Sequence, residues 1–181
     1  MNTRRRILCA DYEEPEVIPR DENDCVRALI NSAQAGYTYT IGYDSGKTIK
    51  CYVDDVDRQV EGRRAKLPYK GLNDAFFYLG SGNRFDDAAD LRYARIKYPS
   101  NGSLFYSTKN LIMLDCLAPT PQGVANYMFK GCASKLRLIR VPKGCREAYV
   151  NSACYAPFAN IIVETKKFND FREVYNNLVG S

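Results

Sequence analysis

The sequence contains no histidine and no tryptophan. Without histidine, the chain has neither a Ser-His-Asp nor a Cys-His catalytic arrangement, and it has no imidazole ligand for zinc. It also lacks the side chain that most often serves as a general base near neutral pH. We therefore expect no catalytic residues, no metal ligands and no cofactor. An enzyme that uses a cysteine or a pair of carboxylates brought together by the fold is the alternative.

Cysteine occurs seven times, but no two cysteines have the C-x-x-C spacing of zinc sites and redox motifs. Because the number is odd, we expect reduced and mostly buried thiols, as in a protein made in the cytoplasm. Long apolar runs are also missing: only Ile7 to Ala10 are apolar between the arginines at 4–6 and Asp11. This is too short for a signal peptide or a membrane span, so we expect no membrane insertion.

Charge is unevenly distributed along the chain, although the net charge is only +5. Three consecutive arginines precede an acidic stretch over residues 11–24, and this order is not typical of a nucleic-acid-binding tail. Nucleic acid is therefore not an expected partner. Residues 1–23 have little periodicity and are predicted to form an extended arm. The predicted contacts of the arm with other protein chains are Arg4, Arg5, Arg6, Ile7 and Leu8.

Residues 24–87 are predicted to form a helix and a β-hairpin. Asp24 is a suitable N-cap and Gly36 a suitable end for a helix between them. Residues 37–43 and 49–53 alternate as two strands joined by the turn sequence DSGK. The remainder, residues 61–87, is rich in turn residues and is predicted to be mostly loop, with a short strand near residues 75–80.

Residues 88–181 contain four apolar segments predicted to be strands: 91–98, 111–117, 136–141 and 160–164. They begin twenty to twenty-five residues apart, which is typical of a leucine-rich-repeat solenoid and too short for Rossmann-type crossovers. The first and third share the pattern Leu-Arg-x-x-Arg followed by Ile or Val. The predicted fold is therefore α+β and β-rich, with a short leucine-rich-repeat-like solenoid after the arm, helix and hairpin.

Residues 111–164 resemble the closing repeats of BspA-like leucine-rich-repeat proteins, which are common in Bacteroidota. The matching elements are Pro119 and Pro121, Phe129 with Gly131, Val141-Pro142-Lys143-Gly144, Ala148-Tyr149, Tyr155 with Phe158, and Ile161 to Glu164. The family often has tryptophan where this chain has CYAPF. The opening residues, MNTRRRILCADYEE, are similar to the starts of short proteins encoded by Bacteroidota phages and prophages.

Two helices are expected to close the repeats. The segment CREAYVNSACYAPF has apolar residues at helical spacing and is the predicted terminal cap, because a last repeat must cover its outer side. The tail has Phe168, Phe171, Val174, Tyr175 and Leu178 on one face of a second helix. That helix either packs on the core, which the pattern favours, or binds a partner.

The resemblance implies a non-enzymatic structural or interaction protein. The phage-like opening favours a virion component, such as a capsid, head-fibre or tail accessory protein. It would be made in the cytoplasm and would dock on other virion proteins of a symmetric assembly. The alternative is a bacterial BspA-like binding or adhesion protein. The fourteen tyrosines suit an interface, but they also suit strands of the fold itself.

Overall fold

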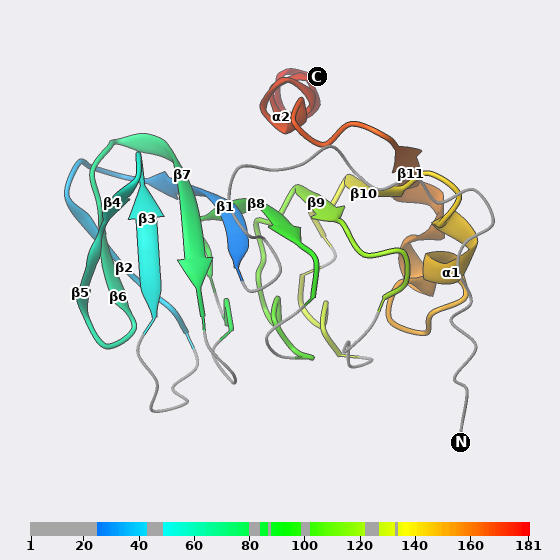
Figure 1. Cartoon of the computed structure of the whole chain (residues 1–181), viewed down its shortest axis with the longest axis horizontal. Helices are drawn as coiled ribbons and strands as arrows, with labels where there is room; N and C mark the ends of the chain where they lie inside the picture. Colours follow the sequence, from blue (N-terminus) through cyan, green and yellow to red (C-terminus); the bar gives the residue numbers. More distant parts are fainter. Residues whose placement is uncertain are drawn as a thin grey trace.

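A computed structural model describes residues 25–42, 49–79, 84–86, 88–98, 102–121, 127–132 and 134–181. The predicted arm and its contact residues Arg4, Arg5, Arg6, Ile7 and Leu8 lie outside the described residues, as does the DSGK turn. The described chain is α+β and rich in strands (Figure 1). The β-rich fold class predicted from the sequence is confirmed at that level.

The first seven strands lie in two sheets that share the main core, and this part of the chain is called the barrel below. They are β1 (Val26–Ser32), β2 (Tyr37–Thr40), β3 (Lys50–Val53), β4 (Val56–Asp57), β5 (Gln59–Glu61), β6 (Arg64–Leu67) and β7 (Gly71–Tyr78). One sheet includes the order β1-β7-β3-β4, and the other has the order β2-β6-β5. Between β4 and β5, Arg58 donates its N–H to the Cys51 carbonyl (2.7 Å) and accepts from the Lys66 N–H (2.8 Å). The two sheets are therefore joined through the backbone of Arg58.

The helix predicted between Asp24 and Gly36 is wrong, because this segment forms β1 and the turn that follows it. β1 lies between β7 and β8 in the centre of the larger sheet. Ala28 and Ile30 face the main core, whereas Leu29 belongs to a second core on the opposite face. A strand covered on both faces has an apolar run without alternation, and this run resembles a helical pattern.

The predicted hairpin of residues 37–43 and 49–53 is also wrong, because its two strands belong to different sheets. β2 pairs with β6, with Tyr37 opposite Leu67, and β3 pairs with β7 and β4. The loop predicted over residues 61–87 contains β6, and β6 pairs with β2 where the predicted hairpin would have placed β3. The strand predicted near residues 75–80 is confirmed as the end of β7.

The next four strands form a parallel ladder, called the ladder below: β8 (Leu91–Ile96), β9 (Met113–Cys116), β10 (Leu138–Pro142) and β11 (Ile162–Thr165). All four were predicted from the sequence. The structure does not show a leucine-rich-repeat solenoid, however. β8 pairs antiparallel with β1, so the ladder is half of an eight-stranded mixed sheet, with the order β11-β10-β9-β8-β1-β7-β3-β4.

A row of phenylalanines lies beneath the ladder, one before each strand: Phe85, Phe105, Phe129 and Phe158. The ring centroids of Phe85 and Phe105 are 6.2 Å apart and those of Phe105 and Phe129 are 6.1 Å apart, with nearly parallel planes in both pairs. The centroids of Phe129 and Phe158 are 5.1 Å apart. Phe85 also contacts Phe77 of the barrel, with ring centroids 5.4 Å apart. The main core therefore runs without interruption from the barrel through the ladder.

Helices cover both faces of the ladder. Between β10 and β11, the helix α1 (Arg146–Val150) and the 3-10 helix η1 (Ala156–Ile161) lie on the side of the main core. α2 (Phe171–Gly180) lies on the opposite side of the sheet (Figure 1). Its buried Phe171 and Tyr175 pack on Leu29, Tyr93 and Met113. The predicted tail helix is confirmed, and it packs on the core.

Candidate functional site

One row of side chains crosses all eight strands of the larger sheet. Pairing registers place these residues side by side from β4 to β11: Asp57, Tyr52, Phe76, Arg27, Arg95, Asp115, Arg140 and Val163. Neighbours in the same register project from the same face of a sheet, which here is the face that α2 covers. The four central residues, Arg27, Arg95, Asp115 and Arg140, are called the charged row below. They carry charge into a position where most sheets carry apolar side chains.

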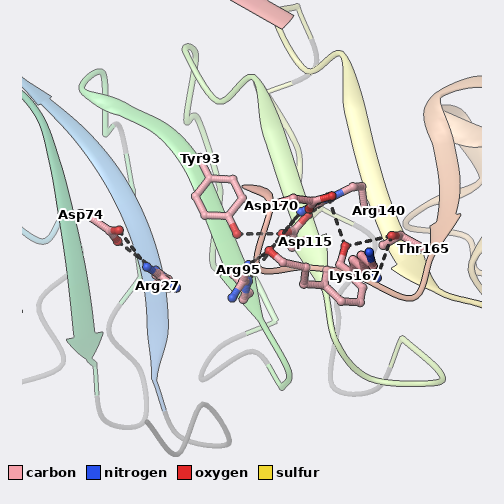
Figure 2. Close-up of polar contacts among 10 residues, drawn as sticks. Arg27, Asp74, Tyr93, Arg95, Asp115, Arg140, Thr165, Lys167 and Asp170 are labelled. Atoms are coloured by element: carbon pink, nitrogen blue, oxygen red, sulfur yellow. Dashed lines mark hydrogen bonds and ion pairs between the residues drawn. The ribbon is translucent and has the colours of Figure 1, made fainter. Parts of the chain in front are cut away.

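Asp115 is at the centre of the charged row and is fully buried (Figure 2). Its Oδ1 accepts from Nε of Arg140 (2.8 Å), and its Oδ2 accepts from Nη2 of Arg140 (2.8 Å). The hydroxyl of Tyr93 donates to the same Oδ2 (2.8 Å), and Nε of Arg95 lies 3.5 Å from it. A two-pronged arginine contact of this kind fixes both orientation and charge. Both carboxylate oxygens are therefore occupied inside the protein.

The segment between β11 and α2 is attached to the charged row. Nη1 of Arg140 donates to Oδ1 of Asp170 (2.5 Å) and to the carbonyl of Lys167 (3.3 Å). The carbonyl of Phe168 accepts from both Arg95 and Arg140. These contacts use the guanidinium groups to position the start of α2 over the sheet.

Aromatic rings of α2 and β7 cover the other end of the charged row. The guanidinium carbon of Arg27 lies 5.0 Å from the ring centroid of Phe76 and 4.3 Å from that of Phe171. Arg95 approaches the same Phe171 ring, at 5.0 Å. Arg27 also donates from Nε and Nη2 to the two oxygens of Asp74, at 2.9 Å each. Cations stacked between rings are stabilised further when water is excluded.

The surroundings of Asp115 shift the pKa values of two of its partners, Tyr93 and Arg140. Burial, together with the charge of Asp115, raises the pKa of Tyr93 well above its ordinary value. Burial alone lowers the pKa of Arg140, but hydrogen bonds and charge interactions with Asp115 and Asp170 outweigh that effect and raise it. Tyr93 therefore stays protonated and Arg140 stays charged over the physiological range. The arrangement is suited to holding strands together, whereas proton transfer requires a pKa near the working pH.

The Leu-Arg-x-x-Arg pattern was visible in the sequence, but its role was not predicted. The second arginine of each copy, Arg95 or Arg140, flanks Asp115 in the structure. The first arginines have different positions: Arg92 donates to the Ala89 carbonyl, and Arg137 donates to the Leu178 carbonyl. Aligning the segment LIMLDC with the two copies places its aspartate between the two arginines. This alignment is the signal that would have identified the charged row.

The described cysteines are buried: Cys25, Cys51, Cys116, Cys132, Cys145 and Cys154. Within the described ranges, no group of three or more cysteine, aspartate or glutamate side chains is arranged to hold a metal ion. In the same part of the chain, no helix is both long enough and apolar enough to cross a membrane.

The fold and the charged row define a strand-rich α+β protein whose buried charges join a barrel, a ladder and a terminal helix. Comparison with protein-family models, with curated proteins and with solved structures finds no match for the chain.

Proposed function

We propose that the chain is a non-enzymatic structural or interaction protein that presents the ladder as a rigid module to other protein chains. The observation that carries the proposal is the engagement of Asp115 by Arg95, Arg140 and Tyr93. This buried group of charges is used to hold strands and α2 together. The proposed interaction then takes place at the outer surface of the sheet. Because the sheet is already rigid, binding a partner there costs little conformational entropy.

We further propose that the chain is a phage virion component, such as a capsid, head-fibre or tail accessory protein. The N-terminal arm would dock it on other virion proteins through Arg4, Arg5, Arg6, Ile7 and Leu8. The phage-like opening supports this proposal. The likeness of residues 111–164 to BspA-like closing repeats supports an interaction role under either function, and the phenylalanine before each ladder strand fits a repeating unit. The alternative function is a bacterial BspA-like binding or adhesion protein.

The two functions can be separated by locating the chain in the bacterium that encodes it. Phage particles are induced and purified on a density gradient, and the chain is quantified in them by mass spectrometry. A virion component is expected at a fixed copy number per particle, and a variant lacking residues 1–8 should be lost from the particles. Absence from the particles, with the chain found instead on the surface of uninfected cells, would support the alternative.

A further inference from the structure

The ladder ends at β11, which is one lateral end of the eight-stranded sheet. At the other end, β4 runs on into β5 of the second sheet, so the barrel continues that end. The Lys143 N–H donates to the Thr165 carbonyl (3.1 Å), which shows that the backbone groups of Thr165 face β10. Because these groups alternate in direction along a strand, the N–H and C=O groups of Ile162 and Glu164 point away from the sheet.

One side chain covers part of this outer edge. Arg146, the first residue of α1, donates from Nε to the Ile162 carbonyl (3.0 Å) and from Nη2 to the Ala159 carbonyl (2.7 Å). The Arg146 N–H donates to Oε1 of Glu164 (2.9 Å). The guanidinium therefore already donates to the Ile162 carbonyl, which an added strand would need as its acceptor. An arginine side chain is a removable cover, since it is exposed and can rotate away without unfolding α1.

The surroundings of this edge carry excess positive charge. The exposed charged residues of β11 and of the adjoining turns are Lys143, Arg146, Glu147, Glu164, Lys166 and Lys167. The carboxylate of Glu164 is already bonded to the Arg146 N–H. Val163 adds an apolar side chain that is 49% exposed. An extended segment with acidic side chains matches both the charge and the strand geometry of this edge.

We propose that the outer edge of β11 binds an extended acidic segment of a partner protein by strand addition, with the Arg146 side chain as its displaceable cover. The incoming strand donates to the carbonyls of Ile162 and Glu164 and accepts from the Glu164 N–H. This inference rests on the proposed function, because it names the surface through which an interaction protein binds.

The test uses the full chain and a fluorescent peptide of alternating glutamate and valine, with a lysine–valine peptide as the control for charge. Binding is followed by fluorescence polarisation. Arg146→Ala removes the cover and should tighten glutamate-peptide binding about tenfold, or ~1.4 kcal/mol. Glu164→Pro removes an N–H that only the partner uses, and its ring blocks the edge, so binding should be lost. Glu164→Ala is the matched control and should still bind.

Hydrogen exchange gives a second measurement, and it needs no variant of the chain. In the unmodified chain, the glutamate peptide should slow exchange of the Glu164 amide. The proposal is overturned if that amide is unaffected, if both peptides bind equally, or if Glu164→Pro folds and binds like Glu164→Ala. In each of these cases, the chain can still be a virion component, because incorporation into particles is measured separately and depends on the arm.

Discussion

Asp115 lies between two guanidinium groups at a position that water does not reach, because the side chains of Asp115 and Arg95 are fully buried. Burying an ion costs several kcal/mol, and only close partners offset that cost. The contacts of Asp115 at 2.8 Å are of this kind. The charged row therefore stabilises one register of the ladder, in which the two arginines face the aspartate. A shift by one residue would place all three side chains on the apolar face.

Replacing Asp115 with asparagine should lower the free energy of unfolding by about 3–5 kcal/mol, because the buried guanidinium groups of Arg95 and Arg140 then lose the charge of Asp115. Urea denaturation measures the change. Asp74→Asn is the matched control. It removes the partner of Arg27, but Asp74 is 23% exposed, so about 1 kcal/mol or less is expected. Equal losses in the two variants would show that burial does not determine the cost.

Gly42 is a residue at which no side chain fits. A Cβ atom there would lie 2.1 Å from the carbonyl oxygen of Asp86 and 2.8 Å from its carbonyl carbon. Backbone atoms yield only with a shift of the chain, so Gly42→Ala should cost about 1–3 kcal/mol or more. Gly180→Ala is the control: nothing lies within 4 Å of its added Cβ, and alanine favours a helix. Thermal unfolding should show a lower midpoint for the first variant and an unchanged or higher one for the second.

The buried thiol of Cys116 gives a pH dependence of stability. Burial raises its pKa from the ordinary 9.0 to about 12. The folded state therefore retains a proton that the unfolded state releases, and stability falls as the pH rises from about 9 to about 12. One such group contributes a slope of about 1.4 kcal/mol per pH unit. The free energy of unfolding, measured by urea denaturation at several pH values in this range, should fall more steeply with pH in the unmodified chain than in Cys116→Ala, by that slope. Equal slopes in the two chains would contradict the raised pKa of Cys116.

At the scale of elements, α2 and the ladder could be predicted from the sequence, whereas the barrel could not. α2 has an amphipathic face with Phe171 and Tyr175, and the ladder strands end at prolines or turns. These signals are local. β1 was taken for a helix because both of its faces are covered. The pairing of β2 with β6 is set by contacts that are distant in sequence, and no local pattern reports them.

The charged row could be predicted only in part, because only some of its features are local in the sequence. The spacing of the two arginines in each repeated pattern is local and was recognised. Their convergence on Asp115 depends on the parallel register of β8, β9 and β10, which is a property of the sheet. Asp170 and the Phe168 carbonyl reach the row only because the chain returns over the opposite face. No sequence spacing predicts that return.

α2 should be held on the sheet mainly by Phe171, which stacks on Tyr93 at 4.7 Å and contacts two arginines. Phe171→Ala should cost about 3–5 kcal/mol and increase hydrogen exchange throughout residues 171–180. Val179→Ala on the same helix is the control, since Val179 is exposed and the change should stay within about 0.5 kcal/mol. Unchanged exchange in the Phe171 variant would mean that the arginine contacts alone retain α2.

At the scale of the whole molecule, the barrel and the ladder share a strand and a core. β1 pairs with β7 on one side and with β8 on the other. Ring contacts continue from Tyr39 and Phe77 in the barrel through Phe85 to Phe105 and Phe129 beneath the ladder. Neither half can unfold without exposing apolar surface of the other. We therefore expect one cooperative unit despite the two architectures.

This expectation can be tested with one substitution in each half. Phe77→Ala in the barrel and Phe105→Ala beneath the ladder each remove a fully buried ring, and each should cost about 3–5 kcal/mol. In a cooperative unit, both variants lower the midpoint of the same transition, and the calorimetric and van't Hoff enthalpies stay equal. Tyr98→Ala, at an exposed position, is the control and should leave the midpoint nearly unchanged. Two transitions, each shifted by only one of the core variants, would show that barrel and ladder fold independently. In that case, β1 would have to separate from β8 while remaining paired with β7.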